Sequence, residues 1–138
     1  MVKTEAIRLR TAGHTDIHDI TPQVRRCVEA SGLRDGQATI FVPGSTAGLT
    51  TVEFEPGLVK DLRSTFEQLA PEGADYAHHA TWGDDNGSAH VRAALIGPSL
   101  TVPFLGGRLT LGTWQQIVLI HLDTRPRERE LVVQMLGE

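Results

Sequence analysis

Residues 114–122 read Trp-Gln-Gln-Ile-Val-Leu-Ile-His-Leu, and this stretch decides the fold. Side chains along a β-strand point alternately to its two faces, so the stretch divides into two sets. Both sets are apolar: Trp114, Val118, Ile120 and Leu122 on one face, Ile117 and Leu119 on the other. A strand of this kind belongs in the middle of a sheet that is covered on both sides. We therefore expect a layered protein with Trp114 in its core.

Other β-rich segments lie along the rest of the chain. The expected strands are Val2–Thr11, Ile17–Ile20, Gln37–Val42, Leu100–Phe104, Arg108–Leu111 and Leu131–Leu136. The first two are expected to pair around the turn Ala12-Gly13-His14. Gly106-Gly107 is typical of a hairpin turn. Pro43–Thr51, which is rich in glycine and hydroxyl groups, is expected to form a turn between β-rich runs.

Apolar spacing and helix-stop signals predict a few short helices. The expected helices are Pro22–Ser31, Pro56–Leu69 and Ser88–Ile96. Thr21 is a favourable cap for the first, and a proline at its first position costs no hydrogen bond. The sequence therefore predicts a single α+β domain over residues 1–138, with a mainly antiparallel, sandwich-like sheet and two or three short helices.

Composition narrows the class of protein. The chain has 138 residues, 40% hydrophobic and 22% charged, with a net charge of −4. A general nucleic-acid binder or a protein of anionic membranes would need a basic face, so we expect neither partner. Cys27 is the single cysteine, which excludes an intrachain disulfide and a cysteine-based zinc cluster. We expect a cytoplasmic protein, because the N-terminus lacks the apolar core of a signal peptide.

Residues 78–90 hold the densest group of titratable side chains. Three histidines occur there with two carboxylates and an amide: His78, His79, His90, Asp84, Asp85 and Asn86. Imidazole, carboxylate and amide groups bind divalent metals or move protons near neutral pH. Zn²⁺ would need His78 or His79 together with His90 and a carboxylate, and Mg²⁺ would prefer Asp84 or Asp85. The alternative is a solvated turn that caps the following helix.

Two further segments are candidates for binding or catalysis. Arg92 is expected in the first turn of the helix Ser88–Ile96, where free N–H groups would help it bind phosphate. Ser45 and Thr46 lie in a glycine-rich turn that could cradle an anion or be an ordinary connection. Gln115 enters a buried strand, so its amide needs partners, and a ligand is one way to supply them. The isolated histidines are interpreted as structural or surface residues: His14, His18 and His121.

Several short segments occur in an order and spacing that together are specific. They are Ser45-Thr46-Ala47, Tyr76-Ala77-His78, Ala89-His90-Val91-Arg92-Ala93, Leu95-Ile96-Gly97-Pro98-Ser99 with Thr101-Val102-Pro103, Gly106-Gly107-Arg108-Leu109, Gly112-Thr113-Trp114-Gln115 and Val132-Val133-Gln134. In these segments, over nearly its whole length, the chain resembles the YjbQ-like family, also called the secondary thiamine-phosphate synthase family. The resemblance implies an antiparallel α+β fold that assembles as a homotrimer with polar clefts near the subunit contacts. It also implies an ability to join a pyrimidine methyl diphosphate to a thiazole phosphate.

The resemblance also marks individual positions. Five residues match recurrent polar positions of the family: Thr46, His78, His90, Arg92 and Gln115. Many members have a histidine where this chain has Gly44, and many have an acid where it has His79. We expect His79 and the segment Trp82–Asp85 to compensate for the missing histidine.

The residues and the resemblance together give a transferase hypothesis with two alternatives. The expected catalytic residues are His78, His90, Arg92 and Gln115. The expected contacts to a small phosphorylated substrate are Ser45, Thr46, Asn86 and Arg92. The candidate ligands of Mg²⁺ or Zn²⁺ are His78, His90, Asp84 and Asp85. The alternatives are a metal-dependent hydrolase that uses a His/carboxylate site and a trimeric anion-binding protein without catalysis.

Overall fold

The apolar run at residues 117–122 forms the centre of a three-stranded antiparallel sheet. The computed structural model describes residues 1–138. In it, β7 (Gln116–His121) pairs with β2 (Asp16–Asp19) along one edge and with β4 (Ala47–Val52) along the other. The residues of β7 from Ile117 onward are buried on both faces. The expectation of a central strand that is covered on both sides is therefore confirmed.

A second, five-stranded antiparallel sheet forms the other main layer. Its order is β1-β8-β3-β5-β6. The bounds are β1 (Val2–Thr11), β8 (Arg127–Gly137), β3 (Gly36–Phe41), β5 (Ser99–Leu105) and β6 (Arg108–Leu109). The longest pairing is β1 with β8, which runs over ten residues from Val2↔Leu136 to Thr11↔Arg127.

The larger apolar core lies between the two sheets. Ile117 and Leu119 of β7 contribute one side, and alternate residues of β3 and β8, such as Ile40 and Val133, contribute the other. Helix α1 (Thr21–Ser31) closes this core with Val24 and its apolar neighbours. Burying such side chains stabilises the fold by about 1.5–3 kcal/mol each, which accounts for the sandwich arrangement.

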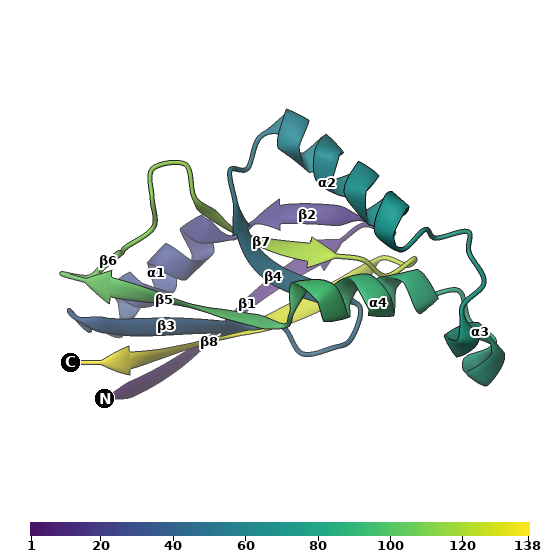
Figure 1. The fold of residues 1–138 in the computed structure, drawn as a ribbon. Coiled ribbons are helices and arrows are strands. Elements are labelled where there is room, and N and C mark those ends of the chain that lie inside the picture. Colours follow the sequence, from purple (N-terminus) through teal and green to yellow (C-terminus); the bar gives the residue numbers. More distant parts are fainter.

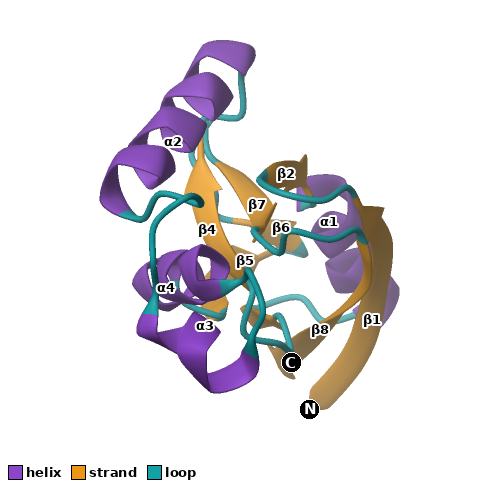
Figure 2. Cartoon of the chain, turned by 90° about the vertical axis from the view of Figure 1, so that its right-hand side faces the viewer, coloured by secondary structure: helices purple, strands orange, loops and turns teal.

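The opposite face of the small sheet is covered by two helices. The side chains of Val118 and Ile120 pack there against α2 (Pro56–Leu69), which supplies Phe66, and against α4 (Gly87–Ile96), which supplies Ala89. Figure 1 shows α2 above β2 and β7, with α4 lower down beside β4. In Figure 2 both helices lie on one side of β4 and β7, while β1 and β8 lie on the other. No helix of the structure is long and apolar enough to cross a membrane.

The structure corrects four expectations from the sequence. The first two strands do not pair, because β1 takes all its partners from β8 while β2 pairs with β7 in the other sheet. Residues Ala47–Val52 form β4 rather than part of a turn, since they complete the edge of the small sheet. Trp114 precedes β7 and is 71% exposed, so it is not a core residue. There are four helices, because the short α3 (Ala77–Trp82) was not expected.

Candidate functional site

Residues from several distant segments meet at the end of the molecule where β7 leads into β8. Helix α3 and the start of α4 lie at this end (Figure 1). A hollow of about 230 Å³ opens beside them, and its lining includes Gly44, Ser45 and His90. The fold therefore brings the Ser45 turn and His90 to one cleft, as the sequence predicted for two parts of one site.

A pair of histidines lies beside this cleft. The ring centres of His78 and His90 are 4.4 Å apart, and Nε2 of His78 lies 3.2 Å from Oδ2 of Asp84. The backbone N–H of Asn86 and then the side chain of His78 lower the pKa of Asp84. Asp84 therefore remains a carboxylate near neutral pH and can accept a hydrogen bond from Nε2 of His78. This His90–His78–Asp84 group is a candidate proton carrier.

His79 has a different role from its neighbour. Its Nε2 accepts a hydrogen bond of 2.9 Å from the backbone N–H of Gly87, and its ring packs edge-on against Tyr76. It thus satisfies one of the free N–H groups at the start of α4. His79 is part of the framework of the site, and the structure does not show it facing the cleft to compensate for Gly44.

A buried carboxylate behind the cleft fixes two predicted phosphate contacts in place. Asp123 is fully buried and accepts hydrogen bonds from Thr46 Oγ1, Asn86 Nδ2, the Arg125 N–H and Arg127 Nε. Burial by itself would raise its pKa, but these hydrogen bonds outweigh it and lower the pKa of Asp123 to about 2. The side chains of Thr46 and Asn86 are therefore engaged within the protein. Ser45 is exposed at the turn.

A buried histidine and a buried arginine extend this polar network between the two sheets. Nε of Arg129 donates to Nδ1 of His121 at 3.1 Å, and Nε2 of His121 lies 3.0 Å from the carbonyl of Arg125. Because arginine only donates, Nδ1 must be the acceptor and Nε2 carries the proton. Burial, followed by the charge of Arg129, lowers the pKa of His121. The prediction of a structural role for His121 agrees with this neutral, fully buried imidazole.

Two predicted catalytic residues lie away from the cleft. Arg92 is the sixth residue of α4, not part of its first turn, and points to the side opposite His90. Its buried guanidinium donates to the carbonyl of Ala70, to Thr15 and to Glu67, which ties α4 to the end of α2. This geometry contradicts an N-terminal phosphate-binding position for Arg92.

Gln115 likewise finds its partners within the chain. It is exposed, accepts from the Gly112 N–H and donates to Thr51 Oγ1. Thr51 lies near the end of β4 remote from Ser45, so the structure does not bring Gln115 to the histidine pair.

The metal-binding prediction lacks a complete set of ligands within one chain. No group of three or more His, Cys, Asp or Glu side chains is arranged to hold a metal ion. Asp85, one of the candidates, instead accepts a hydrogen bond from Thr124. The residues present therefore do not form a full zinc or magnesium shell, and we derive no chemical step from a metal.

The network residues that the sequence interpretation missed are Asp123, Arg127 and Arg129. A signal for Arg129 was present: Leu131, Val133 and Met135 alternate along β8 and face the core, and Arg129 continues the same alternation. A charged residue on a buried face needs polar partners, which is a reason to suspect a site. Gly44 lies against this arginine, because a Cβ at position 44 would be 3.2 Å from its Nη1.

Comparison with known proteins places the chain in a family. Residues 5–138 match the family described as "UPF0047 protein YjbQ-like". The chain belongs to the YjbQ-like UPF0047 family. Its relatives in this family include a UPF0047 protein of Archaeoglobus fulgidus, which is 42% identical over 94% of this chain and 98% of the relative. UPF0047 protein YugU of Bacillus subtilis is 33% identical over 99% of this chain and 100% of the relative.

Solved structures of similar proteins have the same fold. A YbjQ-like protein of unknown function from Sulfolobus solfataricus superposes with a TM-score of 0.94 at 36% identity, covering 100% of this chain and 99% of the other. A hypothetical protein from Aeropyrum pernix gives a TM-score of 0.92 at 32% identity, with 99% of each chain covered. The resemblance to the YjbQ-like family and the predicted α+β class are both confirmed.

Proposed function

We propose that this YjbQ-like protein is a transferase that acts on a small phosphorylated substrate. The reaction to test first is the one implied by the family resemblance, in which a pyrimidine methyl diphosphate is joined to a thiazole phosphate. One observation carries the proposal: His90, which contacts His78, shares a cleft with the exposed Ser45 turn. A proton carrier and a small anion-binding turn on one cleft suit the departure of a phosphorylated leaving group.

In this reaction the protein supplies no nucleophile. The thiazole nitrogen donates its electron pair to the pyrimidine methylene, and the C–O bond electrons leave with the diphosphate. His90 hydrogen-bonds the departing oxygen, with His78 and Asp84 behind it. The Ser45 hydroxyl and the adjacent small residues contact the phosphate oxygens. Catalysis then consists of positioning and charge stabilisation.

The proposal includes a homotrimer, as the resemblance implies. It is supported by the outer face of the five-stranded sheet, against which no helix packs (Figure 1). Most of that face carries uncharged side chains, which is typical of the interior of a protein interface.

The direct experiment measures thiamine phosphate formed by the purified protein from the two phosphorylated precursors, separated by chromatography. We expect product from the wild type and a fall in kcat of about a hundredfold or more in His90→Asn, because general acid–base groups contribute at least that much. The matched control is His14→Asn, since the exposed side chain of His14 pairs with Glu72 and does not line the cleft. Absence of product, or equal rates for His90→Asn and the wild type, would overturn the proposal.

The second candidate is hydrolysis of a small ester with a bound metal. It is favoured by one observation, the closeness of His78, His90 and Asp84, which a ligand group from a second subunit would complete. Metal analysis of protein purified without a histidine tag decides it. Stoichiometric zinc that is lost in His90→Ala supports this candidate, and metal-free protein contradicts it. Stabilisation by precursors without turnover would instead indicate a binding protein.

A further inference from the structure

Arg129 is a buried arginine that has no carboxylate partner. Only 6% of the residue is exposed, and its hydrogen bonds go to the neutral groups of His121 and Thr46. Asp123, the buried carboxylate nearby, directs its side-chain ion pair to Arg127 at 2.6 Å. The charge of Asp123 acts on Arg129 without a direct ion pair, and all the hydrogen bonds of the guanidinium go to neutral groups. The positive charge of Arg129 is therefore only partly compensated, which favours an anion close to it.

One nitrogen of this guanidinium is free. Nε and Nη2 make all the hydrogen bonds of the Arg129 side chain, and Nη1 makes none within the chain. The only fully buried side-chain nitrogen or oxygen without a hydrogen-bond partner is Oε1 of Gln23. Nη1 of Arg129 has no partner either, so it must be accessible to solvent. It lies beside Gly44, where a Cβ would be only 3.2 Å away. Glycine at position 44 therefore leaves open the approach to Nη1.

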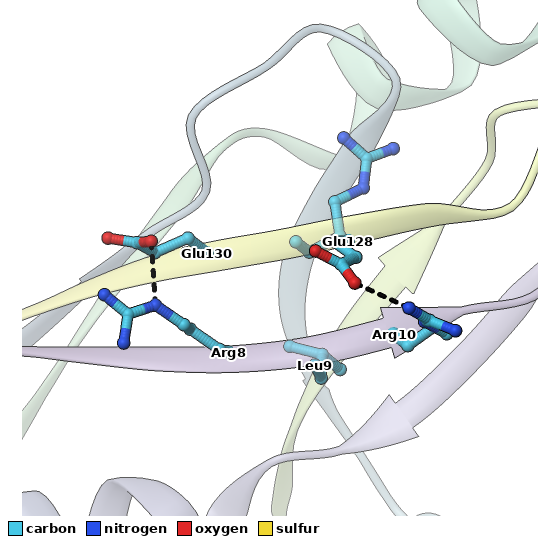
Figure 3. Close-up of a pocket in the computed structure, with 6 residues that line it drawn as sticks. Arg8, Leu9, Arg10, Glu128 and Glu130 are labelled. Atoms are coloured by element: carbon cyan, nitrogen blue, oxygen red, sulfur yellow. Dashed lines mark hydrogen bonds and ion pairs between the residues drawn. The ribbon is translucent and has the colours of Figure 1, made fainter.

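A hollow of about 360 Å³ lies on this side of the turn, lined in part by Pro43, Gly44 and Arg129. Gly44 also lines the His90 cleft, so the two hollows share one residue. Glu128 and Glu130 border the Arg129 hollow but are engaged in ion pairs with Arg10 and Arg8 across β1 and β8 (Figure 3). The charges of Glu128 and Glu130 are therefore largely neutralised by these partners, whereas Arg129 has no ion pair.

We propose that the hollow at Pro43, Gly44 and Arg129 binds a phosphate or carboxylate group through the free Nη1 of Arg129. This anion site takes the role that the sequence gave to Arg92. Arg129 is held by His121 and Thr46, so its free N–H groups are oriented before the anion arrives, which reduces the entropic cost of binding. The inference deepens the proposed function, because it assigns the substrate's second phosphate or another anionic end to a place beside the His90 cleft.

The test uses inorganic phosphate as the probe and needs no turnover. Phosphate is titrated into the full chain by calorimetry at constant ionic strength, and the side-chain N–H resonances of Arg129 are followed by NMR. We expect phosphate to shift the Arg129 resonances. We also expect Gly44→Ala to weaken phosphate binding by about tenfold or more, because one hydrogen bond to a charged group is worth that factor.

The matched control for Gly44→Ala is Gly107→Ala. Both glycines have positive φ, +118° and +77°, but nothing lies within 4 Å of a Cβ at position 107. Gly107→Ala should therefore show the backbone strain without the loss of phosphate binding. Arg129→Lys gives an independent variant, since an ammonium cannot contact His121, Thr46 and a phosphate together as the planar fork does. It should weaken phosphate binding by a similar factor.

Phosphate that binds Gly44→Ala and Arg129→Lys as tightly as the wild type, or that leaves the Arg129 resonances unmoved, would overturn the inference. His90→Asn separates it from the proposed function. If that variant keeps phosphate binding and no protein forms product, the anion site stands while the transferase fails. If the wild type forms product but phosphate does not respond to Gly44→Ala and Arg129→Lys, the transferase stands while the anion site fails.

Discussion

Asp123 connects two distant parts of the chain to its own segment through one buried carboxylate. Its oxygens accept hydrogen bonds from Thr46, Asn86, Arg125 and Arg127. We predict that Asp123→Asn lowers the free energy of unfolding by about 1–3 kcal/mol, because an amide cannot accept all these bonds and leaves donors unpaired. Urea denaturation near neutral pH measures the change. The control is Asp85→Asn, an exposed carboxylate that makes a single side-chain hydrogen bond to Thr124, and equal stability of the two variants would contradict the prediction.

His121 makes the stability of the protein dependent on mildly acidic pH. Burial and then the charge of Arg129 place its folded pKa below the usual 6.5, so the unfolded chain binds the proton first. The stabilisation that neutral His121 contributes is complete above the unfolded pKa of 6.5. It is lost as the pH falls from there toward the folded pKa. We predict a melting temperature that falls as the pH is lowered from about 7 to about 5.

His121→Gln tests the source of this pH dependence. Glutamine can still accept a hydrogen bond from Arg129, but it does not titrate. The variant should be less stable near pH 7, and its melting temperature should depend much less on pH. His14→Asn, at an exposed histidine, should leave the pH dependence of the melting temperature unchanged. An unchanged slope in His121→Gln would show that another group is responsible.

Arg92 and Arg129 show how far single residues could be interpreted from the sequence. Residue type and spacing singled out this region as a candidate site, and the structure places His90 and Ser45 on one cleft. Which arginine lies beside this cleft is decided by tertiary contacts, which the sequence pattern does not reveal. Arg92 is drawn to the end of α2 by Ala70 and Glu67, whereas Arg129 is brought to the turn by the pairing of β8 with β1 and β3.

At the level of elements, the junction between α3 and α4 depends on one glycine. A Cβ at Gly87 would lie 2.5 Å from the side chain of Tyr76 and 2.8 Å from Nε2 of His79. We predict that Gly87→Ala destabilises the protein by about 1–3 kcal/mol through overpacking, and that it increases hydrogen exchange in α3. The control is Gly73→Ala, since a Cβ there meets nothing within 4 Å. Protection in α3 that equals the wild type would contradict the prediction.

Helices and strands with a clear periodicity of apolar residues were predictable from the sequence, and those without one were not. β7 has apolar residues on both faces, and α2 has an apolar stripe together with the side chain of Glu55, which caps its first N–H groups. β4 was missed because its glycine and threonines are typical of turns, and it becomes a strand only by pairing with β7. α3 has six residues, too short for a helical period to be recognised, and Gly83 in a left-handed conformation ends it.

At the scale of the whole molecule, the outer face of the five-stranded sheet is a regular surface that no helix covers. Its outward side chains are uncharged over most of the sheet: Val2, Thr4, Ala6, Gln37, Thr39, Phe41, Ser99, Thr101, Pro103, Val132, Gln134 and Leu136. The charged pairs Arg8–Glu130 and Arg10–Glu128 lie at one end only (Figure 3). Depletion of charge over such an area, with Phe41 43% and Leu136 50% exposed, favours contact with another protein surface.

We therefore predict that the protein sediments as three chains of 15.0 kDa each and that this face holds them together. Phe41→Glu places a charge within the contact, at the end of β3, where desolvation without a partner is costly, so it should release monomers. Leu69→Glu is the matched control, because Leu69 is 66% exposed at the end of α2, on the other side of the molecule. Sedimentation velocity of the two variants at equal concentration decides the matter. A trimer that survives Phe41→Glu and is lost in Leu69→Glu would move the subunit contact to the helical side, where the His90 cleft would then lie between chains.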